Sequence, residues 1–204
     1  MRKSSLFALA VLGAITALGS AGAQDIPAAT RGDLEVGGTF SIAKPDLPGA
    51  ILYTNPVRYT TDSLIYGGGI YVNFNVTPHL GLTAQFDYPD VHTPDDLVEK
   101  SYMAGLRYYH PLGGGRLVPY VKVLGGIGST KFSNKVVWVI YPGTPTNGNT
   151  ASYGTVAFGG GFDYRWKRKW TVRAIDFQYE DWLSFPGGSI HPYIVSAGIS
   201  YEIR

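Results

Sequence analysis

Hydrophobic and polar residues alternate along most of this chain, in about eight extended runs. In the run 81–88, apolar or large residues hold every second position, and small, polar or charged residues lie between them. Side chains two positions apart share one face of a strand, so each run has an apolar face and a small or polar face. The runs that this pattern predicts as strands are 33–43, 64–75, 81–91, 100–110, 117–132, 152–166, 170–182 and 191–203.

The connections between these runs alternate in length. The short ones are 76–80, 112–116 and 167–169, and the long ones are 44–63, 92–99, 133–151 and 184–190. Both termini then lie at the end with the short turns, which is typical of outer-membrane barrels with periplasmic turns and extracellular loops. The sequence therefore predicts an all-β fold, an eight-stranded antiparallel up-and-down transmembrane β-barrel.

The apolar face is expected to lie outside, against lipid. Eight strands enclose a lumen that side chains just fill, and rings such as Phe40, Phe158 and Trp166 would crowd it. The opposite face is rich in glycine and carries both acids and bases, which suits a narrow interior with ion pairs. The polar network predicted for the lumen consists of Glu35, Asp87, Arg107, Lys122, Asp163, Arg165, Arg173, Asp176, Glu180 and Glu202.

The run 170–182 requires a change of register. Strict alternation would turn Asp176 and Glu180 toward lipid, where a charge at the bilayer midplane costs up to about 2–4 kcal/mol. We therefore predict a β-bulge near 174–175, which brings both acids into the lumen and turns Phe177 outward. The alternative is that this end of the strand projects into water.

Aromatic and basic residues mark the predicted membrane interfaces. Trp166 and Trp170 bracket the basic turn 167–169, as in a girdle with cations at the headgroups. The tyrosines expected at this rim are Tyr108, Tyr120 and Tyr201, and those expected at the opposite rim are Tyr66, Tyr88 and Tyr102.

The N-terminus reads as a secretory signal peptide. Arg2 and Lys3 precede an apolar stretch at 6–18, and a small-x-small cleavage pattern follows at 21–23. An uncleaved anchor is the alternative, but the apolar stretch is shorter than the ~20 residues of a spanning helix. We expect a signal peptide at 1–23 and one barrel domain at 24–204.

Charge and cysteine content narrow the possible partners. Without Arg2 and Lys3, the total of 17 Lys and Arg falls to 15, equal to the 15 Asp and Glu, so no basic field favours nucleic acid. The absence of cysteine excludes disulfides and thiolate metal sites. We expect no cofactor and no metal, and outer-membrane lipid as the first partner.

These features together resemble the small OmpA/OmpX-type outer-membrane barrels, including the opacity-like surface proteins. The resemblance rests on the signal peptide, the strand count, the start of the seventh strand at 170–173 and the finish at 201–203. It implies an integral location in the bacterial outer membrane and covers 24–204. The chain departs from the family in ending Ile203-Arg204 rather than in an aromatic residue, and no wall-binding domain is expected to follow.

Two segments carry candidate chemistry. Ser189, His191, Asp181 and Glu180 lie close enough in sequence for a nucleophile, a base and an acid, but scattered histidines in turns are more often ordinary rim residues. The connection 133–151 holds an apolar run that can mark a binding surface, or that can prolong the flanking strands as an edge for strand addition. The residues of this candidate surface-binding loop are Val136, Val137, Trp138, Val139, Ile140 and Tyr141.

The sequence thus favours a non-enzymatic outer-membrane barrel with a structural or surface-adhesion role. Three alternatives remain open: a narrow channel for small solutes, a soluble periplasmic barrel that binds an apolar ligand, and a lipid-modifying enzyme. The side of the wall on which the aromatic rings lie discriminates between the membrane barrel and the soluble one.

Overall fold

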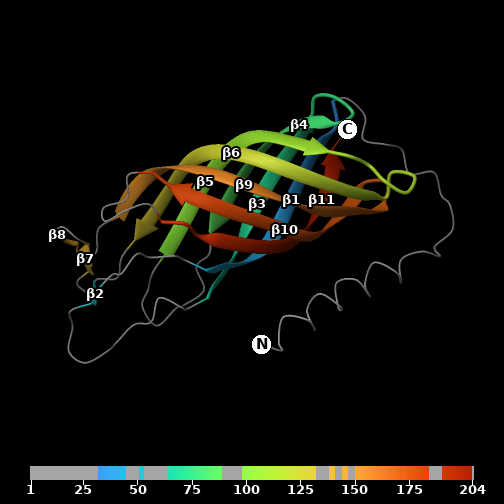
Figure 1. The fold of residues 1–204 in the computed structure, drawn as a ribbon. Coiled ribbons are helices and arrows are strands. Elements are labelled where there is room, and N and C mark those ends of the chain that lie inside the picture. Colours follow the sequence, from blue (N-terminus) through green and yellow to red (C-terminus); the bar gives the residue numbers. More distant parts are fainter. Residues whose placement is uncertain are drawn as a thin grey trace, which may run out of the picture.

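Eight long strands close into one barrel in the computed structural model (Figure 1). The structure describes residues 32–44, 51–52, 64–88, 98–131, 138–140, 144–146, 150–183 and 190–203. The predicted leader 1–23 lies outside these residues and stays a prediction. The barrel strands are β1 (Leu34–Lys44), β3 (Ile65–Asn75), β4 (Leu80–Tyr88), β5 (Val98–Tyr109), β6 (Leu117–Lys131), β9 (Thr150–Lys167), β10 (Trp170–Trp182) and β11 (Tyr193–Ile203).

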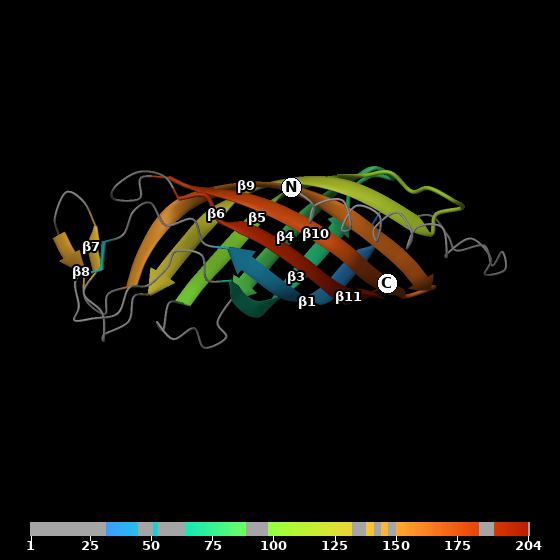
Figure 2. The same cartoon turned by 60° about the horizontal axis from the view of Figure 1, so that its bottom comes forward.

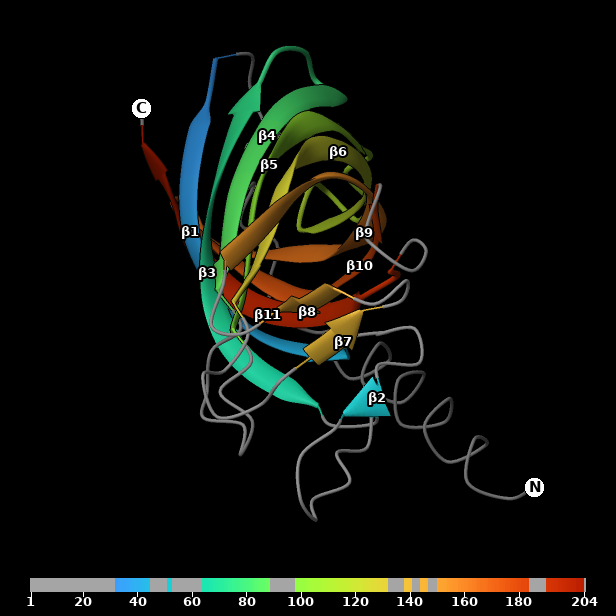
Figure 3. The same ribbon diagram turned by 90° about the vertical axis from the view of Figure 1, so that its left-hand side faces the viewer.

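The strand order around the barrel is β1-β11-β10-β9-β6-β5-β4-β3, and every pair is antiparallel. Closure is complete because β1 pairs with β11 on one side and with β3 on the other (Figure 3). A closed ladder leaves no edge strand and satisfies the backbone groups without water, as a lipid environment requires. In the described part of the chain, no helix is long and apolar enough to span a membrane.

The apolar face of each strand points outward, as predicted. Phe40 is 58% exposed, Ile70 61% and Trp166 57%, whereas Asp163 and Arg173 in the lumen are 2% and 3% exposed. A barrel dissolved in water would carry the opposite arrangement, so the soluble ligand-binding alternative is wrong.

The two ends of the barrel differ in their connections. Short turns join β3 to β4, β5 to β6 and β9 to β10, and three consecutive glycines with positive φ form the turn at 113–115. Leu34 and Ile203 pair at the same end, so the termini of the barrel lie with the short turns (Figure 2). We call this the turn end, and the opposite one the loop end.

A small second sheet lies beyond the loop end (Figures 1 and 3). It consists of β2 (Ile51–Leu52), β7 (Trp138–Ile140) and β8 (Thr144–Thr146), with β7 in the middle. The interpretation that the apolar run prolongs the flanking barrel strands is therefore wrong for its described part, 138–140, because β7 pairs with β2 and β8 in a sheet of its own.

The predicted bulge in β10 is confirmed. The register between β10 and its two neighbours shifts between Arg173 and Asp176 on one side, and between Arg173 and Ile175 on the other. After the shift, Ile175 and Phe177 are exposed to lipid, and Asp176 is buried. One extra residue thus keeps the acids of this strand out of the hydrocarbon.

The girdle at the turn end is confirmed except for one tyrosine. The ammonium of Lys167 lies 4.8 Å from the ring centre of Trp166, and the rings of Trp170 and Tyr201 lie 5.1 Å apart. Tyr120, however, is only 4% exposed and faces the lumen. Its position along β6 fits the rim, but its place in the alternation is on the same face as Lys122, and the alternation decides which way a side chain points.

Candidate functional site

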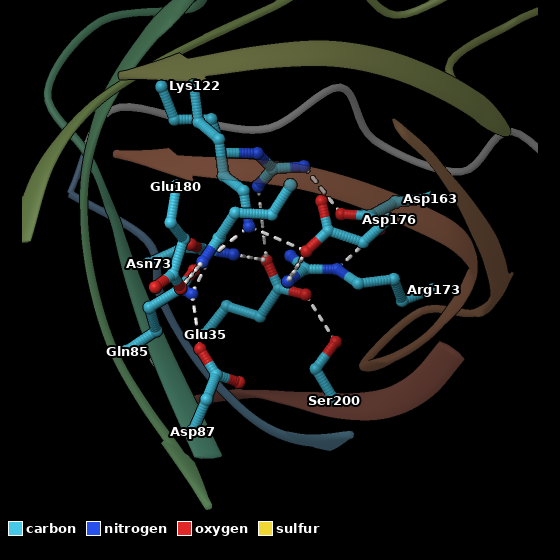
Figure 4. A network of polar contacts seen from close by, with 12 residues as sticks. Glu35, Asn73, Gln85, Asp87, Lys122, Asp163, Arg173, Asp176, Glu180 and Ser200 are labelled. Atoms are coloured by element: carbon cyan, nitrogen blue, oxygen red, sulfur yellow. Dashed lines mark hydrogen bonds and ion pairs between the residues drawn. The ribbon is translucent and has the colours of Figure 1, made fainter. Parts of the chain in front are cut away.

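A connected network of polar side chains fills the lumen (Figure 4). It begins at Glu35 near the turn end of β1 and reaches Trp182 at the loop end of β10 through hydrogen bonds and ion pairs. Every barrel strand contributes at least one polar side chain to this network, and β11 contributes the hydroxyl of Ser200, which donates to Glu35.

Asp163 is the centre of this network. Its Oδ2 accepts a hydrogen bond of 2.5 Å from Nη2 of Arg107, and its Oδ1 accepts one of 3.1 Å from Nε of Arg173. Arg107 also lies 3.9 Å from the carboxylate of Glu35, which accepts hydrogen bonds from Asn73 and Ser200. One buried carboxylate therefore holds two guanidinium groups, in the charge-assisted geometry that gives the strongest hydrogen bonds.

Asp176 carries the network toward the middle of the lumen. It accepts a hydrogen bond of 2.6 Å from Nζ of Lys122 and lies 3.8 Å from Nη1 of Arg173. Lys122 is 3% exposed and Asp176 5%. Because the bulge at 174–175 sets the direction of Asp176, the irregularity in β10 is what completes this ion pair.

Two glutamines link the ion pairs to the loop end. Gln85 accepts a hydrogen bond from Lys122 and donates to Asp87 and to Gln178, at 2.6 and 2.8 Å. Gln178 donates to Glu180 at 2.8 Å, and the other oxygen of Glu180 accepts from the indole of Trp182 at 2.7 Å. Neutral donors thus hold Asp87 and Glu180 in this half of the lumen.

Two lumenal tyrosines were missed by the sequence analysis. The guanidinium of Arg173 lies 3.6 Å from the ring centre of Tyr71, and that of Arg107 lies 4.1 Å from the ring centre of Tyr120. These are close cation–π contacts. The strict alternation that places Lys122 inside also places Tyr120 inside, so the signal was present. Gly37 leaves the space for Tyr71, since a Cβ there would overlap the phenol ring.

The predicted network residues all lie on the lumenal face of their strands. The buried ones are Asp87, Arg107, Lys122, Asp163, Arg173, Asp176 and Glu180. The other three, Glu35, Arg165 and Glu202, lie near the turn end and are partly exposed. Contacts join Glu35 to the buried group.

The candidate catalytic group is only partly described. Nδ1 of His191 lies 3.5 Å from Oδ1 of Asp181, and the ring of His191 stacks on Tyr179 at 5.6 Å. Glu180 points into the lumen toward Gln178 and Trp182, and so does not join this pair. Ser189 lies outside the described residues. Among the described residues, no group of three or more His, Cys, Asp or Glu could hold a metal ion.

The candidate surface-binding loop is described in its centre alone. Trp138, Val139 and Ile140 form β7, whose backbone pairs with β2 and β8. Val136, Val137 and Tyr141 lie outside the described residues.

Comparison with known proteins identifies the family. The family model described as outer membrane protein beta-barrel domain matches residues 7–202. A comparison with curated protein sequences gives no match. Three solved structures share the fold at low sequence identity, and each is covered over its whole length.

The first of these structures is Neisserial surface protein A, with a TM-score of 0.61 and 10% identity over 85% of this chain and 100% of the other. The outer membrane protein OprG from Pseudomonas aeruginosa has a TM-score of 0.56 and 14% identity, over 88% and 100%. Ail, the attachment invasion locus protein of Yersinia pestis, in complex with the heparin analogue sucrose octasulfate, has a TM-score of 0.54 and 16% identity, over 85% and 100%. With its closed eight-stranded wall, its lipid-facing rings and this match, the chain belongs to the outer membrane protein β-barrel family and is an integral protein of the bacterial outer membrane.

Proposed function

We propose that this barrel is a closed scaffold that serves surface adhesion through the connections at its loop end. The observation that carries the proposal is the filled lumen. Salt bridges and hydrogen bonds cross it from the partly exposed Glu35 to the buried Trp182, and they leave the exterior of the loop end as the accessible surface.

The second sheet supports a shaped extracellular surface. β2 comes from the connection after β1, and β7 and β8 come from the connection after β6, so strand pairing joins two long connections. The outer strands of this sheet, β2 and β8, each have an edge of the kind to which an extended partner strand can add. Among the similar structures, the one of Ail holds a heparin analogue. Heparin-coated surfaces are therefore a first choice of test surface.

The loop replacement tests adhesion directly. We expect that replacing 136–141 by a Gly/Ser segment of equal length abolishes the binding of barrel-bearing cells to host-cell and heparin-coated surfaces, because it removes β7. The matched control replaces 184–189, a segment of the same length in another long connection. Insertion is checked by protease resistance and by the shift of the folded band in unheated gels. Unchanged binding after the 136–141 replacement would reject the adhesion role.

Conductance separates the scaffold from the narrow-channel alternative. In a planar bilayer, we expect the protein to show no stable open level, because ions would have to displace buried salt bridges that each gain from low local dielectric. A stable opening in the unaltered protein would favour the channel and count against a closed scaffold.

A further inference from the structure

A groove of about 760 Å³ crosses the lipid-facing wall of β3, β4, β5 and β6. Its floor is a row of small residues that pair across neighbouring strands: Ala84 with Ala104, and Ala104 with Gly125. All three are exposed on the outer face, and a Cβ built on Gly125 would meet open space. The wall therefore has a real depression here, not merely a change of side-chain type.

Bulky side chains form the wall, or bank, of the groove on the side of the loop end. The next row of outer-face residues toward the loop end contains Phe86, Tyr102 and Ile127, each paired in register with its neighbour. The rings of Phe86 and Tyr102 lie 4.6 Å apart, and those of Phe86 and Tyr88 lie 6.2 Å apart. Because Tyr102 belongs to the aromatic girdle predicted at the extracellular interface, this bank lies at the outer edge of the hydrocarbon.

Polar and cationic groups lie directly above this bank. Lys100 pairs in register with Ser129, and Ser129 pairs with Ser152. Both serines line the groove, and their hydroxyls lie 3.3 Å apart. The ammonium of Lys100 lies 4.7 Å from the ring centre of Tyr88, and Lys131 is exposed two residues beyond Ser129 on β6. On the outer face of β3 to β6, no described side chain is acidic.

We propose that this groove is a specific site for one anionic lipid of the extracellular leaflet. One acyl chain lies in the groove over Ala104, and a headgroup phosphate lies against Lys100, Lys131 and the hydroxyls of Ser129 and Ser152. The charge favours this occupant over a neutral lipid, because a phosphate at headgroup depth meets ammonium groups and hydroxyl donors and no described carboxylate. Each methylene group of the acyl chain that moves from the surrounding lipid into the groove gains packing contacts with the groove floor and with the bulky side chains beside it.

The acyl part of the site is tested by filling the groove. The purified barrel in neutral detergent is titrated with lipid A, an acylated and phosphorylated glycolipid, and bound lipid is counted by native mass spectrometry. We expect Ala104→Leu to weaken lipid A binding by about tenfold, whereas Ala197→Leu leaves it within about twofold. Ala197 is the matched control because it is exposed on β11, on the opposite side of the barrel. Gly125→Leu is a second filling variant, for which the wall offers open space.

The headgroup part is tested by charge. We expect Lys100→Gln with Lys131→Gln to weaken lipid A binding by about tenfold and to leave phosphatidylcholine binding unchanged, with Lys44→Gln at the end of β1 as the control. Equal binding of lipid A to the Ala104→Leu, Gly125→Leu and Ala197→Leu proteins would overturn the proposal, as would equal binding of the neutral and anionic lipids to the unaltered barrel. Either result would reduce the groove to ordinary lipid contact.

Discussion

Buried charged groups have different kinds of partner in the two halves of the lumen. Toward the turn end, three acids and three bases lie in contact: Glu35, Asp163 and Asp176 against Arg107, Lys122 and Arg173. Toward the loop end, the buried acids are Asp87, Glu99 and Glu180. Neutral amide and indole groups donate to Asp87 and Glu180, and Lys122 connects to both through the amide of Gln85.

The two halves differ in what the removal of one side chain would leave without a partner. In the half near the turn end, each charge depends on a charge of opposite sign, and its loss would strand a buried ion. In the half near the loop end, Glu180 depends on the neutral donors Gln178 and Trp182, and Oε1 of Glu99 has no hydrogen-bond partner among the described residues. Neutralising an acid should therefore lower the free energy of unfolding much more in the first half than in the second.

The largest effect is expected from Asp163→Asn. The amide keeps the shape but leaves Arg107 and Arg173 buried without their shared carboxylate, so the free energy of unfolding should fall by about 3–5 kcal/mol. The measurement is urea-induced unfolding of the barrel in lipid vesicles, followed by tryptophan fluorescence. Arg168→Gln, on the exposed turn between β9 and β10, is the control and should change the free energy by less than about 0.5 kcal/mol. A loss below about 1 kcal/mol for Asp163→Asn would contradict the role of Asp163 as the centre of the network.

A smaller loss is expected from Lys122→Met. Methionine retains most of the apolar stem, and Asp176 keeps Arg173 at 3.8 Å, so the free energy of unfolding should fall by roughly 1.5–3 kcal/mol. The matched variant is Asp176→Asn, and the double variant closes a cycle. If the two losses simply add, then the 2.6 Å contact between Lys122 and Asp176 contributes no coupling energy. The half of the lumen near the turn end would then differ less from the half near the loop end than the ion-pair geometry indicates.

The strands and their faces could be predicted because each depends on neighbours in sequence. Alternation sets the inward and outward faces, and the cost of placing acids in lipid was enough to locate the bulge after Arg173. Tyr120 differs from the prediction because its position along the strand places it at the rim, whereas the alternation turns its side chain into the lumen. In a barrel wall, an odd or even position in the strand therefore decides the direction of a side chain more than the residue type does.

The partners within the lumen could not be predicted from the sequence. Arg107 on β5 reaches Asp163 on β9, although β6 lies between these two strands. Such contacts depend on the stagger that the strands acquire when the barrel closes, and stagger leaves no periodic trace in the sequence. The pairing of 51–52 with 138–140 is equally long-range, so the second sheet also escaped prediction.

The smallest effect is expected from Glu99→Gln, and it tests the loop end of the comparison. Glu99 is 3% exposed, and it pairs in register with Thr130, whose hydroxyl also has no hydrogen-bond partner among the described residues. No described base compensates the negative charge of Glu99, so burying that charge costs desolvation energy. Replacing the carboxylate by a neutral amide removes this cost, and the free energy of unfolding should stay the same or rise by up to about 1 kcal/mol. Glu180→Gln is the matched variant, and it should cost about 1 kcal/mol because two good donors lose an ionised acceptor. A loss for Glu99→Gln as large as that for Lys122→Met would mean that a cation accompanies Glu99 in the folded protein, and the two halves of the lumen would then follow one rule.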